Sequence, residues 1–134
     1  MEPVQNRIEK LPFMDWRQLP AVIAGLDINL MPLENSLFHW CKSENKWTEA
    51  ALVKVPSVMS RNCEMEYVVE NGKDGWMCTT KEEWVNALEA LVTDEKARKA
   101  MGEAAHQKVM EHYLTVNTGK DAMEELLCSE SYTK

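Results

Sequence analysis

The chain has 134 residues, of which 45% are hydrophobic and 28% are charged, and its formal net charge is -7. This length suits one domain with a hydrophobic core, and the composition excludes a disordered, collagen-like or low-complexity protein. The negative charge repels phosphate backbones and no local basic stripe offsets it, so no nucleic-acid partner is expected.

The first part of the chain alternates short β-like runs with helical patterns, which is typical of parallel strands joined by crossover helices. Ile8 to Phe13 is predicted to form a short strand, which Pro12 restricts to an edge or to its own end. Asp15 then suits a helix N-cap, with an apolar stripe that begins at Leu19 and with Gly25 at the helix end.

A nearly continuous apolar run from Asp27 to Leu33 predicts a buried parallel strand that leads into a polar loop. The pattern then predicts a helix, a strand, a short helix and a last short strand: Ser43 to Val53, Val55 to Ser60, Glu64 to Glu70, and Gly75 to Cys78. We therefore expect a Rossmann-like α/β fold of three layers, with a parallel sheet of about four strands.

The rest of the chain shows helical patterns only. Thr80 and Glu83 have the spacing of a capping box before an apolar helical stripe, and Asp94 suits the start of a second helix. A weaker helical pattern runs from Lys120 to Leu127, and the residues after it are expected to fray. We expect one domain over residues 1–114, and a C-terminal helix with a frayed tail over residues 115–134.

The cysteines and the apolar runs bear on location and on metal binding. The four cysteines are far apart, with no C-x-x-C pair and no histidine at zinc-ligand spacing, so no metal site is expected. The polar opening stretch is unlike a signal peptide, which favours reduced thiols in a cytoplasmic protein. No apolar run approaches the roughly 20 residues that span a bilayer, so any membrane contact is expected to be peripheral.

The residues that suggest chemistry follow the strand at Asp27 to Leu33. Lys42, Lys46 and Glu49 have spacings that place them on one face of the predicted helix, near the crevice where open α/β sheets bind ligands. For a ligand that carries a diphosphate and a ribose, the lysines would supply positive charge to the diphosphate and Glu49 would accept hydrogen bonds from the ribose hydroxyls. The alternative is that Lys46 and Glu49 form a surface ion pair worth under about 1 kcal/mol.

The loop before this helix supplies the other binding candidates. Backbone N–H groups around Ser36, Leu37 and Phe38 suit a phosphate, and Ser43 follows Lys42 near the helix start, where the helix dipole favours an anion.

Two weaker candidates lie nearby. His39 is in the same loop, although a loop histidine is more often solvated. The turn with Arg61, Asn62 and Glu64 follows the next strand, and an ordinary surface connection explains it equally well.

The region from about Arg7 to Leu114 resembles the C-terminal, donor-binding domain of GT-B glycosyltransferases of the retaining, glutamate-containing kind (the group 1 type). The resemblance covers about four fifths of the chain. It rests on the order and spacing of several segments: Asp27 to Leu33, Lys42-Ser43, Lys46, Glu49-Ala50-Ala51, Val55-Pro56, and Glu64 to Gly75.

The resemblance implies transfer of a glycosyl group from a UDP- or GDP-linked sugar to an acceptor hydroxyl, without a cofactor. It implies that Glu49 contacts the nucleotide ribose, and we assign to Lys42 and Lys46 the catalytic stabilisation of the leaving diphosphate. Many relatives carry a glutamate eight positions before Glu49, where this chain has Cys41, so that sugar-orienting role is not carried over.

A full donor domain of this family begins with two further strands, and a separate lobe binds the acceptor. Neither is recognisable in this sequence. We therefore expect the chain to be inactive in isolation and to need the missing N-terminal acceptor lobe or another protomer. The alternative is a non-enzymatic α/β protein-interaction module, which the missing strands and Cys41 both favour.

Overall fold

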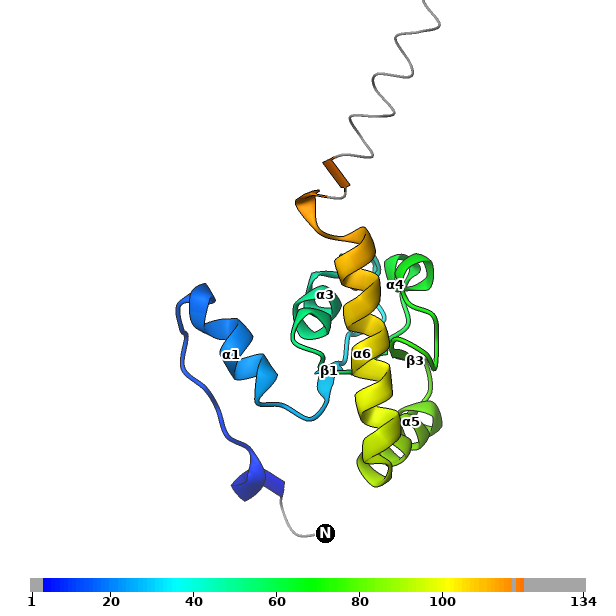
Figure 1. The fold of residues 1–134 in the computed structure, drawn as a ribbon. Coiled ribbons are helices and arrows are strands. Elements are labelled where there is room, and N and C mark those ends of the chain that lie inside the picture. Colours follow the sequence, from blue (N-terminus) through cyan, green and yellow to red (C-terminus); the bar gives the residue numbers. More distant parts are fainter. Residues whose placement is uncertain (1–3, 117, 120–134) are drawn as a thin grey trace, which may run out of the picture.

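The computed structural model describes residues 4–116 and 118–119, and it has a three-stranded parallel sheet at its centre (Figure 1). The strands are β1 (Asn29–Met31), β2 (Ser57–Ser60) and β3 (Trp76–Cys78), in the order β1-β2-β3. Both neighbouring pairs are parallel. The carboxyl ends of all three strands therefore lie at one edge of the sheet, where ligands bind in open α/β folds.

Helices connect the strands and form the second half of the domain. Two 3-10 turns come first, η1 (Val4–Arg7) and η2 (Trp16–Gln18). The α-helices are α1 (Leu19–Ala24), α2 (Leu37–Trp40), α3 (Asn45–Leu52), α4 (Cys63–Val68), α5 (Lys81–Thr93) and α6 (Glu95–His112). The long helix α6 packs against both α3 and α5, as Figure 1 shows.

Alternate side chains of β2 enter two separate hydrophobic clusters. Met59 packs in one cluster with Trp47 of α3 and Met65 of α4. Val58 points the other way, into a cluster with Leu91 of α5. Because neighbouring strand residues face opposite sides of a sheet, α3 and α4 cover one face and α5 covers the other. The Rossmann-like, three-layer α/β fold predicted from the sequence is thus confirmed.

The predicted strand at Ile8 to Phe13 is wrong. This segment is irregular and its apolar side chains are exposed, with Phe13 fully so, and the described residues therefore form three strands rather than about four. Pro12 has no N–H for a ladder, and a strand forms only where a neighbour can accept its backbone hydrogen bonds.

Local capping signals are confirmed at three helix starts. Asp15 accepts a hydrogen bond from the Arg17 N–H at 2.9 Å, although it begins the 3-10 turn η2 that leads into α1 rather than the α-helix directly. Thr80 and Glu83 form the predicted capping box of α5, and Asp94 caps α6. The predicted helix at residues 120–127 lies outside the described residues.

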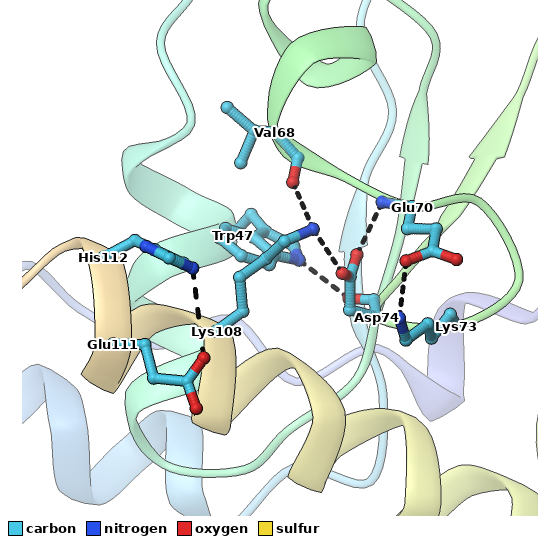
Figure 2. Close-up of polar contacts among 8 residues, drawn as sticks. All are labelled: Trp47, Val68, Glu70, Lys73, Asp74, Lys108, Glu111 and His112. Carbon is cyan, nitrogen blue, oxygen red and sulfur yellow. Dashed lines mark hydrogen bonds and ion pairs between the residues drawn. The ribbon is translucent and has the colours of Figure 1, made fainter.

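A buried polar cluster ties α6 to the turn before β3 (Figure 2). Lys108 Nζ lies 2.5 Å from Asp74 Oδ2 and donates to the Val68 carbonyl at 2.7 Å. The other carboxylate oxygen of Asp74 accepts from the Glu70 N–H, and its carbonyl accepts from Trp47 Nε1. Because Asp74 is only 2% exposed and precedes β3, the cluster stabilises the end of the sheet opposite the carboxyl edge.

Candidate functional site

Two hollows lie at the carboxyl ends of the strands, and Leu33 borders both. The first, which we call the basic hollow, has a volume of about 370 Å³ and is lined by Met31, Leu33, Cys41, Lys42, Ser43, Asn45 and Lys46. The second, the central hollow, has a volume of about 220 Å³. It is lined by residues 33–35, His39, Trp40, residues 60–62, Glu66, Cys78 and Thr79.

The basic hollow brings together three of the residues chosen from the sequence, Lys42, Ser43 and Lys46. One part of the argument for them is wrong: Lys42 lies before α3, which begins at Asn45, so helical spacing does not place it beside Lys46. The chain between α2 and α3 does so instead. Two lysines around one hollow form a site suited to an anion.

Phe38 also lies beside this group. The Lys42 ammonium is 5.0 Å from the centroid of the Phe38 ring, within the range of a cation–π contact. This contact holds the Lys42 side chain near α2, and most of the Phe38 side chain remains exposed.

Ser36 caps α2, a short helix that the sequence analysis did not predict. Its hydroxyl accepts from the His39 N–H at 3.4 Å and lies 2.9 Å from His39 Nδ1. Its own N–H donates to the Glu34 carbonyl at 2.9 Å. The Ser36 N–H, which we expected to bind a phosphate, therefore already donates within the loop. Leu37 is the first residue of α2, and its side chain is exposed.

Glu49 is exposed on α3, one turn beyond Lys46, and it is not among the residues that line either hollow. Among the ion pairs of the described residues, none joins Glu49 to Lys46. The alternative explanation of these two residues as a surface pair therefore has no support in the geometry.

The central hollow contains residues that sequence reasoning treated as weak candidates or missed. His39, Arg61 and Asn62 all line it, whereas Glu64 does not. Trp40 and Thr79 also line it and were not considered as candidates. Thr79 directly follows β3, and Trp40 ends the short helix that follows β1. Position relative to the strand ends was thus the available signal.

The loops around the central hollow are fixed by hydrogen bonds between strand ends. Ser60 Oγ accepts from the Leu33 N–H at 2.8 Å and donates to the Leu33 carbonyl at 3.1 Å, which joins the ends of β1 and β2. Asn62 is buried and caps α4 by accepting from the Met65 N–H at 2.8 Å. The hollow is therefore largely preformed.

The thiol of Cys78 lines the central hollow and is not activated as a nucleophile. Burial raises the pKa of the Cys78 thiol, which keeps it protonated and unreactive near neutral pH. Within the described residues, no group of three His, Cys, Asp or Glu side chains is placed to hold a metal ion.

Comparison with known proteins identifies the class. The chain is similar to the C-terminal domain of a glycosyl transferase group 1 family protein, LpcC, from Francisella tularensis, with a TM-score of 0.58 and 18% sequence identity. The match covers 77% of this chain but only 52% of that one, so this chain spans about half of its length. At this low identity the likeness concerns the fold alone, which is that of a glycosyltransferase C-terminal domain.

The family follows from the sequence match. The family model for glycosyl transferases group 1 matches residues 2–94, well over half of the chain. The chain therefore belongs to the group 1 glycosyltransferases, as the resemblance found in its sequence implied. No curated protein matches it.

In the part of the chain that the structure describes, no helix combines the length and the apolar character that crossing a membrane requires.

Proposed function

We propose that this chain is the donor-binding part of a GT-B glycosyltransferase, which holds a UDP- or GDP-linked sugar while a glycosyl group moves to an acceptor hydroxyl. The observation that carries the proposal is the pair Lys42 and Lys46 around one hollow, at the carboxyl edge of a parallel sheet, in a chain of this family. A diphosphate needs concentrated positive charge, and this hollow offers it.

Each residue then has a role. Lys42 and Lys46 stabilise the charge that develops on the leaving diphosphate, and Ser43 donates to a phosphate oxygen. Leu37 and Phe38 present backbone N–H groups at the start of α2, beside Ser36.

The rest of the machinery is expected elsewhere. The acceptor site is expected in an N-terminal lobe or in another protomer, so these 134 residues by themselves bind the donor without turnover. We place the protein in the cytoplasm, where nucleotide sugars and reduced thiols occur together.

Calorimetric titration with UDP and GDP tests the phosphate site. We expect one of them to bind, and Lys42→Ala and Lys46→Ala each to weaken binding by about tenfold or more, because each loses a charge-assisted contact. Lys99→Ala is the matched control, since Lys99 is an exposed lysine paired with Glu95 on α6. The absence of binding by either nucleotide would refute the proposal.

The ribose contact of Glu49 has its own test. The parent chain is expected to bind the nucleotide more tightly than its 2′-deoxy and 3′-deoxy analogues, and Glu49→Ala is expected to abolish this preference. Glu89→Ala removes an exposed carboxylate from α5 and serves as the control. If the preference for the ribose hydroxyls survives Glu49→Ala, Glu49 does not contact the ribose. That result would not contradict the roles proposed for the lysines.

One observation favours the second candidate, a non-enzymatic interaction module. Ile8, Leu11, Phe13 and Trp16 are exposed near the N-terminus, and β1 pairs with β2 but with no other strand in residues 4–116 and 118–119. Such a surface suits a protein partner. If the module is correct, the chain binds a protein and gives no heat with either nucleotide.

A further inference from the structure

Trp40 forms part of the wall of the central hollow and is 46% exposed. Its indole Nε1 donates to Asn35 Oδ1 at 2.7 Å, and Asn35 lines the same hollow. The polar atom of the indole is thus already satisfied within the protein. What remains for a ligand is the flat apolar surface of the ring.

The short helix that carries Trp40 is held in place against α4. Asn62 Nδ2 donates to the His39 carbonyl at 3.5 Å, and Cys63 Sγ donates to the Trp40 carbonyl at 2.9 Å. With Ser36 capping the other end, α2 is fixed at both ends. A fixed aromatic surface binds without a large loss of side-chain entropy.

Polar groups surround this surface. Glu34 lies on the same loop as Asn35, and Arg61 and Glu66 form an ion pair at 3.0 Å in the wall. The hollow thus combines one apolar face with both donors and acceptors. Its volume of about 220 Å³ is less than the ~300–1,000 Å³ of pockets that bind drug-sized ligands, so it suits one ring rather than a whole nucleotide sugar.

We propose that the central hollow takes the sugar ring of the donor and that the Trp40 ring packs against the apolar C–H face of that sugar. The inference rests on the proposed function: a diphosphate in the basic hollow places the attached sugar next to Leu33, which both hollows share. A pyranose has hydroxyl groups at its rim and an apolar face, which matches this mixture of groups. Trp40 is thereby a residue that determines which sugars are accepted.

The experiment compares bare nucleotides with nucleotide sugars on the full chain. UDP, GDP, UDP-glucose, UDP-galactose, UDP-N-acetylglucosamine and GDP-mannose are titrated by calorimetry. We expect at least one sugar to bind more tightly than its bare nucleotide. Trp40→Ala is expected to reduce this sugar-dependent gain by about fivefold to tenfold, the scale of one aromatic contact, while the bare nucleotide changes less than about twofold.

Two further variants distinguish loss of the Trp40 ring contact from a general loss of the fold. Trp40→Phe keeps an aromatic ring and is expected to retain most of the gain. Trp16→Ala removes an exposed tryptophan that lies outside both hollows, so it is expected to change nothing. Thermal unfolding of each variant shows whether the fold is kept.

The outcomes distinguish a failure of the sugar site from a failure of the proposed function. If no nucleotide binds, the proposed function fails and the inference fails with it. If nucleotides bind but no sugar adds affinity, or if Trp40→Phe and Trp40→Ala both leave the gain intact, only the sugar site is overturned. Equal weakening of bare nucleotides and nucleotide sugars by Trp40→Ala would place the contact on the nucleobase and overturn the inference as well.

Discussion

Gly102 lies where α6 crosses the turn between α3 and β2, and it has no room for a side chain. A Cβ at this position would lie 2.1 Å from the carbonyl oxygen of Lys54. Lys54 itself has a positive φ of 63°, a left-handed conformation that brings the turn close to the helix.

We therefore expect Gly102→Ala to lower the free energy of unfolding by about 1–3 kcal/mol, since the clash is with backbone and α6 must shift. Urea denaturation measures the change. Gly119→Ala is the control, because an added Cβ there meets nothing within 4 Å. Equal denaturation midpoints for the two variants would show that α6 does not pack as described.

Asp74 and Lys108 make a second residue-scale prediction. Asp74→Ala leaves Lys108 without its carboxylate and leaves the Glu70 N–H without its acceptor, so we expect a loss of about 3 kcal/mol of unfolding free energy. Lys73→Ala breaks only the exposed pair with Glu70 and is expected to have no measurable effect. Similar losses in both variants would contradict a stabilising role for the buried pair.

At the scale of elements, the start of α5 is sensitive to pH. The Thr79 and Thr80 N–H groups donate to the Glu83 carboxylate at 2.6 and 3.0 Å, and these bonds lower the pKa of Glu83. A lowered pKa in the folded state stabilises the protein above the ordinary value near 4.5, and this stabilisation is lost as the pH falls through the folded pKa.

The prediction is that Glu83→Gln lowers the melting temperature at pH 7 and that the difference from the parent disappears in acid, below the lowered pKa. Thermal unfolding followed by circular dichroism between pH 7 and pH 3 measures it. Glu89→Gln changes an exposed glutamate in the middle of α5 and is the control, which should leave the melting temperature at pH 7 close to that of the parent. A constant difference at every pH would mean that the carboxylate charge is not involved.

At the scale of the whole molecule, the N-terminal segment and the sheet contribute unequally to stability. Phe13 is fully exposed, so Phe13→Ser is expected to change the unfolding free energy by less than about 0.5 kcal/mol. Met59 is completely buried at the centre of the sheet, and Met59→Ala is expected to cost about 2–5 kcal/mol. Urea denaturation compares them; a large loss for Phe13→Ser would show that the segment packs on the domain.

The missed and wrong predictions share a cause, which is dependence on distant residues. The strand at Ile8 to Phe13 was predicted from local composition, but a strand also needs a neighbour that the described residues do not supply. The role of Trp40 was missed because it depends on Asn62 and Cys63, which a strand and a helix separate from it. The position of Trp40 after β1 can be read from the sequence, but no local pattern marks the contacts that hold it there.

The parallel strands and the capped starts of α5 and α6 could be predicted from the amino acids, because periodicity and capping depend on residues only a few positions apart. The family was recognised from the order and spacing of several segments along the chain. The sequence also drew attention to Lys42 and Lys46, which both line the basic hollow, although the helical spacing used to choose Lys42 was wrong. Other features are visible only in the folded structure, because each joins groups from different elements. They are the residue Leu33 shared by the two hollows, the hydrogen bonds that hold α2 against α4, and the close approach of Gly102 to Lys54.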